Sequence, residues 1–261
     1  MKGRERGERG AVRGSVLAVA AVIVLAAGGG LWWFLSGDEP AAVDLDSAAS
    51  VLSTTSTAPS EDLPPVSEGG GDPGPGAGVD GTWTVDTSIG SFSFEDASSS
   101  FVGFRVDEEL ASIGATEAIG RTPKVTGTIE IEGTTLVAAS IEADFTAIVS
   151  NDDRRDNKIQ GALETNQFPT ATFVLTEPAE LGTIPGNGES VSVTARGDLT
   201  VHGITNSIEI PLQAQLVDGV IVVVGSTDIT FADYDVTAPS AVIVLSVEDH
   251  GQLELQLFFT R

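Results

Sequence analysis

Hydrophobic and polar residues alternate along most of the chain from residue 81 to its end. In residues 125–132 the odd positions are apolar or Gly and the even positions are Thr or Glu, and residues 253–259 repeat the scheme. A period of two is typical of strands with one buried and one solvated face. Residues 220–224 form a continuous apolar run instead, which indicates a strand buried on both faces.

Gly-containing turns separate these runs, for example at Gly133, Gly203 and Gly219. Many short strands joined in this way predict an all-β sandwich or barrel. Alternation alone does not distinguish the two, nor a filled core from a cavity. One short helix is expected within residues 151–163, where Asn or Asp can cap its start and apolar residues recur four positions apart.

Residues 15–35 contain no charged side chain. As a helix they would be about 31 Å long at ~1.5 Å per residue, close to the ~30 Å hydrocarbon thickness of a bilayer. Basic residues precede them and acidic residues follow, so the positive-inside rule places residues 1–14 in the cytoplasm as a basic tail. We therefore expect a single-pass signal anchor in the cell membrane. The alternative is a cleaved signal peptide and a secreted domain.

Residues 36–80 are rich in Ser, Thr, Gly, Pro and acidic residues. This composition predicts a disordered linker, because it offers too little apolar surface to bury. The domain would then begin at residue 81 and extend to residue 261, on the extracytoplasmic side of the membrane.

The chain has no Cys and a net charge of −25, which excludes disulfides and makes nucleic-acid binding unfavourable. Nucleophile-elbow, P-loop and H-E-x-x-H motifs are absent from the sequence. The two histidines, His202 and His250, each precede a Gly and are expected at turns, satisfied or solvated. We therefore predict no catalytic residues, no metal site, no cofactor and no enzymatic activity.

Several segments together resemble the YceI-like family of bacterial envelope proteins, across about residues 81–261. Each segment is weakly specific, and their shared order and spacing carry the resemblance. They read FVGFRVDEEL (101–110), GRTPKVTG (120–127), RRDNKIQ (154–160), ETNQFPTATF (164–173), GDLTVHGITNSIEIPL (197–212), DITFADYDVTAP (228–239) and GQLELQLFF (251–259). The family often has a His shortly after the Arg155-Asp156 pair, where this chain has Asn157 and Lys158.

The resemblance implies a lipocalin-like antiparallel barrel whose apolar lumen holds a long-chain isoprenoid lipid, quinone or similar amphiphile. Arg155 is a candidate for binding the lipid headgroup at the barrel mouth; alternatively, Arg155 and Asp156 fix the helix against a strand end. The candidate lumen residues lie on the apolar parity of the strands and would serve equally as ordinary core: Phe104, Ile129, Ile131, Ile141, Phe145, Phe173, Leu199, Val201, Ile210, Leu212, Phe231, Leu255 and Leu257.

We therefore expect an extracytoplasmic lipid-binding protein tethered to the cell membrane. Two alternatives remain. One is a surface domain whose barrel loops bind a protein or wall polymer without a lipid, for which Tyr234 is a candidate exposed aromatic residue. The other is an envelope hydrolase that uses paired carboxylates. The sequence does not determine the lipid, the physiological role or the oligomeric state.

Overall fold

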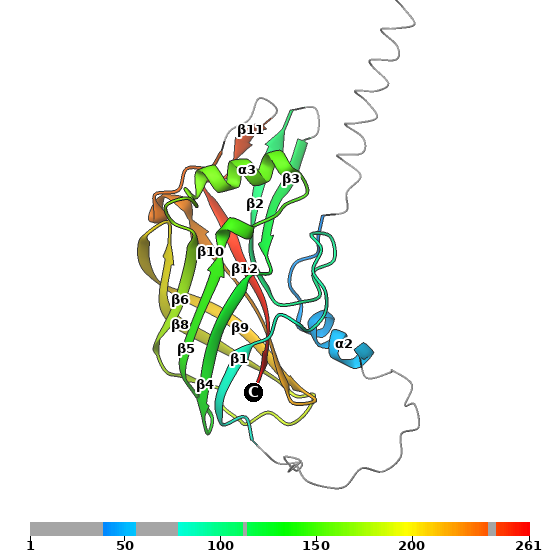
Figure 1. Cartoon of the computed structure of the whole chain (residues 1–261). Helices are drawn as coiled ribbons and strands as arrows, with labels where there is room; N and C mark the ends of the chain where they lie inside the picture. The colour runs from blue at the N-terminus through cyan, green and yellow to red at the C-terminus, as the bar shows by residue number, and fades with distance from the viewer. Residues whose placement is uncertain (1–38, 56–77, 112–113, 240–243) are drawn as a thin grey trace, which may run out of the picture. The chain divides into compact units, whose positions relative to one another are not determined.

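The computed structural model describes residues 39–55, 78–111, 114–239 and 244–261. Its main body is an antiparallel barrel of eight strands, closed where the last strand pairs with the first (Figure 1). The predicted all-β barrel is thereby confirmed. In order of pairing, the wall consists of β1 (Gly81–Val85), β4 (Val125–Glu132), β5 (Thr135–Asp144), β6 (Thr170–Glu177), β8 (Ser190–Val201), β9 (Ile204–Val217), β10 (Val220–Thr230) and β12 (His250–Thr260).

A hairpin extends the wall beyond the short strand β1. β2 (Phe101–Leu110) pairs with the N-terminal half of β12, where β1 no longer reaches, and β3 (Gly114–Thr122) pairs with β2. The short strand β11 (Val244–Val247) adds to the end of β2, and β7 (Ala179–Glu180) adds to β5. Consequently β12 is paired along both of its edges for most of its length.

Because successive side chains of a strand point to opposite faces, the apolar side chains of each alternating strand point into the barrel. Ile129, Ile210, Leu255 and Leu257 belong to one interior cluster with Trp83. Trp83 itself is 3% exposed, and its indole N–H donates to the Val79 carbonyl. At the other end of the interior, Leu199, Val201 and Ala171 form a second cluster with Tyr234.

Helix α3 (Asp153–Ala162) matches the helix predicted within residues 151–163. The Asp152 carboxylate caps it by accepting from the Arg154 N–H at 2.7 Å, which satisfies a backbone donor left free in the first turn. On its inner side Ile159 is buried, and the Gln160 side-chain amide donates to the Phe145 carbonyl. These contacts hold α3 against the start of the 3-10 turn η1 (Phe145–Ala147).

A second helix, α2 (Leu45–Thr55), lies within the segment expected to be a linker without regular structure. The expectation of one helix is corrected to two. Asp44 accepts from the Ser47 N–H at 2.9 Å at its start, and Leu45 and Ala48 are buried against Val222 and Phe258 of the barrel. An apolar stripe at helical spacing explains why this part of the segment docks instead of remaining a coil.

The fully apolar run in β10 is buried on both faces, as predicted. Ile221 and Val223 face the barrel interior, whereas Val222 and Val224 face outward beneath α2. Among the described residues, no helix has the length and apolarity needed to cross a bilayer. The predicted anchor, residues 15–35, lies outside the described residues.

Candidate functional site

Of the thirteen predicted lumen residues, eleven lie in or against two adjoining clusters inside the barrel, and Phe104 and Phe231 lie in neither. Seven of them are buried: Ile129, Ile131, Leu199, Val201, Ile210, Leu255 and Leu257. Six are only partly buried: Phe104, Ile141, Phe145, Phe173, Leu212 and Phe231. Trp83 completes the lining of the first cluster and was not among the predicted residues. Its position in the alternating stretch Gly81–Val85 is a sequence signal that could have identified it.

Five of the six partly buried side chains lie over an inward-facing glycine of another strand or turn. In the pair formed by Phe104 and Gly120, a β-carbon on the glycine would lie 2.7 Å from the Phe104 ring. The same holds for Phe173 over Gly197 at 2.5 Å. The other three pairs are Ile141 over Gly127, Leu212 over Gly225 and Phe231 over Gly251.

These glycines determine where the large side chains lie. Each side chain occupies the space that a β-carbon would fill, so it extends along the barrel wall and reaches less far toward the axis. Phe173 and Leu212, both in the middle of their strands, keep partial exposure although a closed wall surrounds them. A core packed to normal density would bury them completely. The pairs therefore favour an interior that the protein's own side chains do not fill.

The predicted headgroup residue Arg155 binds a carboxylate of the barrel. Its Nη2 lies 2.6 Å from Oε1 of Glu108, a buried residue on β2. Burial raises the pKa of the Glu108 carboxyl above its ordinary value, and the Arg155 charge opposes that rise. Asp156 accepts from both the N–H and the hydroxyl of Ser150. The two contacts join α3 to Glu108 of β2 and to Ser150.

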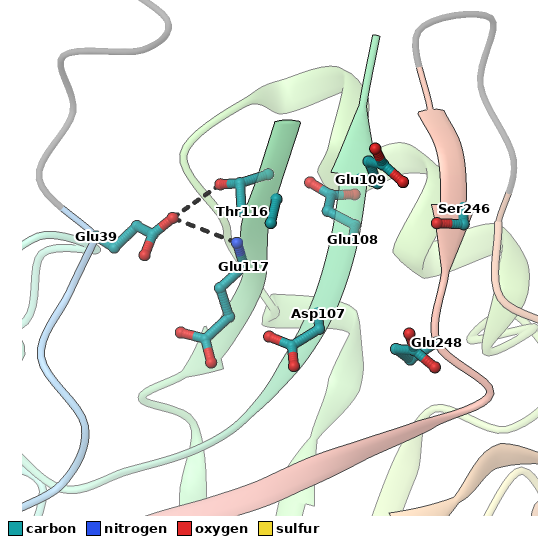
Figure 2. A pocket seen from close by; sticks show the side chains of 9 residues that line it. Glu39, Asp107, Glu108, Glu109, Thr116, Glu117, Ser246 and Glu248 are labelled. Carbon is teal, nitrogen blue, oxygen red and sulfur yellow. Dashed lines mark hydrogen bonds between the residues drawn. The ribbon is translucent and has the colours of Figure 1, made fainter. Parts of the chain in front are cut away.

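An acidic groove with a volume of about 790 Å³ lies beside this ion pair. Figure 2 shows carboxylates along β2 and β3, with Glu39 of the described N-terminal segment beside Thr116 and Glu117. Glu39 from that segment accepts from the Thr116 hydroxyl and the Glu117 N–H. This groove is polar and negatively charged, unlike the barrel interior, and it would repel an anion. Its lining consists of Glu39, Asp107, Glu108, Glu109, Ala115, Thr116, Glu117, Ser246 and Glu248.

Tyr234 differs from its sequence-based interpretation as an exposed loop aromatic. It ends the 3-10 turn η2 (Phe231–Tyr234) and is only 3% exposed, because its ring packs against Ala171, Leu199 and Val201 inside the barrel. Tyr234 therefore does not support the alternative in which exposed loop aromatics bind a protein or polymer.

His202 lies in a turn, as expected, whereas His250 is the first residue of β12 and pairs with Thr230. His250 is exposed, and a hydrogen bond with Asp249 raises the pKa of its imidazole. Together with Glu248 these residues form, among the described part of the chain, an exposed trio whose ligand atoms lie within 4.8 Å of one another. His202 is neither solvated nor fully satisfied: its Nε2 is buried and forms no hydrogen bond.

Comparison with solved structures finds a domain of the same fold and two chains with a weaker likeness. A polyisoprenoid binding domain from Saccharophagus degradans, implicated in plant cell wall breakdown, is 18% identical with a TM-score of 0.51, covering 69% of this chain and 98% of that domain. BcnA from Burkholderia cenocepacia is 20% identical with a TM-score of 0.49, covering 67% and 98%. The YceI protein of Campylobacter jejuni is 16% identical with a TM-score of 0.44, covering 53% and 82%.

A comparison with curated proteins finds no match. Residues 94–259, by contrast, match the YceI-like domain, and this stretch contains the barrel strands from β2 onward together with α3. The match covers more than half of the sequence and agrees with the resemblance of the separate segments. The chain belongs to the YceI-like domain family.

Proposed function

We propose that the barrel binds a long-chain lipid, an isoprenoid or a similar amphiphile, in its apolar interior. The observation that carries this proposal is the set of large inward side chains laid over glycines, of which Ile141, Phe173 and Leu212 remain partly exposed within the closed wall. A hydrocarbon tail in that space would gain about 0.8 kcal/mol for each buried methylene. Such a site needs few polar contacts, in keeping with the apolar lining.

The family relationship supports the same ligand class. The Saccharophagus degradans relative of this fold is described as a polyisoprenoid binding domain. We extend that ligand class to this chain because the strands that match the family also have apolar side chains at their inward-facing positions.

We further propose that residues 15–35 anchor the protein in the cell membrane and that the barrel lies on the extracytoplasmic side. The basic residues before this stretch and the acidic residues after it support this orientation. Protease treatment of intact spheroplasts should remove the barrel and leave the N-terminus protected. Release of the barrel into the medium during growth would instead support cleavage of a signal peptide.

A direct test is lipid extraction from the full-length protein purified from its native envelope. Mass spectrometry under native conditions should detect a bound lipid, and organic extraction should identify it. Protein that is repeatedly recovered empty, and that binds no added isoprenoid, would contradict the proposal.

A pair of neighbouring alanines on β5 tests whether the interior is hollow. Ala139 faces inward opposite Ile129, whereas Ala138 faces outward and is exposed. In a hollow barrel, Ala139→Phe should fold with near-normal stability and lose lipid binding, while Ala138→Phe should bind normally. In a solid core, Ala139→Phe would cost about 1–3 kcal/mol or more from overpacking. Thermal unfolding and lipid titration of both variants separate the two cases.

A further inference from the structure

The phenol of Tyr234 is a polar group placed within an apolar interior. Its ring contacts the second interior cluster, which contains Leu199 and Val201 on the inward parity of β8. The backbone of the same residue is fixed from outside, because its carbonyl oxygen lies 3.1 Å from Nδ1 of His202. The ring is therefore held in one place by packing and by its own main chain.

The Tyr234 hydroxyl has no hydrogen-bond partner. Among the described residues, it and His202 Nε2 are the buried side-chain polar atoms without one. His202 Nε2 has the Glu164 carboxylate 3.7 Å away. Burial raises the pKa of the Tyr234 hydroxyl, and the nearby Asn206 side chain opposes that rise. The Asn206 amide donates to the Asp233 carbonyl, however, and the hydroxyl itself is left without a hydrogen bond. A buried hydroxyl without a partner destabilises the fold, so the site is suited to an additional oxygen atom.

The charges around this residue determine which kind of oxygen it can accept. Its neighbours in the chain, Asp233 and Asp235, are exposed carboxylates. Glu164 lies against the contacting His202, and Arg155 is already bound to Glu108. A phosphate anion would meet negative charge here, whereas a hydroxyl or carbonyl oxygen could accept the phenol proton without that penalty.

We propose that the Tyr234 hydroxyl hydrogen-bonds the terminal oxygen of the bound lipid, and that this lipid has an uncharged head, as in a prenol or an isoprenoid quinone. The inference rests on the proposed lipid-binding function and specifies the ligand's polar end. The tail would lie along the apolar lining, with the oxygen at the end of the interior near η2.

The experiment compares three probes that share an isoprenoid chain: solanesol, its phosphate ester and the hydrocarbon squalene. Full-length wild-type protein should bind solanesol more tightly than solanesyl phosphate. Tyr234→Phe keeps the ring and should weaken solanesol binding about five- to tenfold, with squalene binding unchanged. A long-chain quinone in place of solanesol should show the same loss.

Thr227→Val is the matched control. Thr227 shares the inward parity of β10, but its hydroxyl already donates to the Glu209 carbonyl at 2.9 Å. This variant should leave the ratio of solanesol to squalene affinity unchanged. An equal loss in both variants, or tighter binding of the phosphate than of solanesol by wild-type protein, would overturn the inference.

The outcomes separate this inference from the proposed function. If wild-type protein binds solanesol and squalene and Tyr234→Phe changes neither affinity, lipid binding stands and the role of the phenol is rejected. If wild-type protein binds none of the probes, both proposals fail. Tyr234 is also the single tyrosine of the chain, so its Raman doublet should report a new phenol hydrogen bond on adding solanesol and none on adding squalene.

Discussion

The two sides of β10 and β12 show how differently one sheet can bury its residues. The outward side, which we call the covered outer face, consists of Val222, Val224, Glu254, Gln256 and Phe258. Val222, Glu254 and Phe258 are 0% exposed there. The inward side carries similar apolar residues, yet several of its neighbours on other strands remain partly exposed.

The outer face is complete because segments of this chain cover it. α2 packs over Val222 and Phe258, and residues 86–100 lie over Gln256, whose amide donates to the Ser99 carbonyl at 2.9 Å. The buried Glu254 carboxylate is bound by the guanidinium groups of Arg105 at 2.8 Å and Arg121 at 2.7 Å.

The two arginines are satisfied in turn. Arg121 and Arg105 each donate to the Ala41 carbonyl, and Arg105 also donates to that of Pro40. Burial would lower the pKa of Arg105, but the Glu254 and Glu117 carboxylates outweigh burial and raise it. Every charge in this group has a partner, whereas the interior has an unpaired phenol. The contrast teaches that this protein completes its outer face with its own chain and leaves the interior suited to another molecule.

The largest expected effect comes from breaking the charge group on the outer face. Glu254→Ala leaves two buried arginines without their shared counter-charge and should cost about 3–5 kcal/mol of unfolding free energy. Denaturant unfolding measures the loss. The control is Glu209→Ala, which breaks the exposed pair with Arg196 and should cost less than about 1 kcal/mol. Equal effects would contradict the distinction between buried and exposed pairs.

Removing the main contact of α2 should have a smaller effect. Leu45→Ala deletes a side chain that is 7% exposed and should cost about 2 kcal/mol through lost packing. Because α2 contacts only the outside of the barrel, hydrogen exchange should accelerate in residues 45–55 and beneath them, with lipid binding retained. The exposed Asp46→Asn should leave exchange unchanged. Loss of lipid binding in Leu45→Ala would show that the two sides are coupled.

A third variant should displace a lining side chain from the barrel wall toward the interior. At Gly120 the three atoms nearest to a new β-carbon would be side-chain atoms of Phe104 and Ile148, so Gly120→Ala should shift the Phe104 ring inward. Displacing about two methylenes of a lipid tail corresponds to roughly tenfold weaker binding. Lipid titration measures this, and adding Phe104→Ala in the same protein should restore affinity. Weak binding that persists in the double variant would contradict the role of the glycine.

The smallest expected effect is a pH dependence at the Arg155–Glu108 pair. Burial raises the pKa of Glu108 above its ordinary value of 4.5, so the folded state takes up this proton first as the pH falls. Its contribution to stability is then full below 4.5 and is lost as the pH rises through the higher folded pKa. As the pH falls from neutral, the thermal midpoint of wild type should rise relative to that of Glu108→Gln. A shift the other way would contradict this sign.

The local pattern predicted much of the fold. Alternation identified the strands and the inward side of each one, and an Asp cap with periodic apolar residues identified α3. Eleven of the thirteen predicted lumen residues lie in or against the two interior clusters, whereas Phe104 and Phe231 lie over Gly120 and Gly251. Their assignment as lipid contacts stays a prediction, because a core and a lipid site use the same residue types.

Other features escaped the sequence analysis for identifiable reasons. The stripe of Leu45, Ala48 and Leu52 was a readable helix signal, hidden within a segment of linker-like composition. Tyr234 was assigned to a loop because a 3-10 turn leaves no clear periodicity in the sequence. The pairing of Phe104 with Gly120 depends on strand register, which local alternation does not specify.

By itself, the sequence determined which residues alternate, which segments are strands, and which face of each strand avoids water, since these follow from neighbours a few positions apart. Only the tertiary structure decided what meets those faces. It brought Glu254 to Arg105 and Arg121, placed α2 over Val222, and left the Tyr234 hydroxyl without a partner. Such pairings join residues distant in the chain, and they depend on barrel closure and register, which no local pattern encodes.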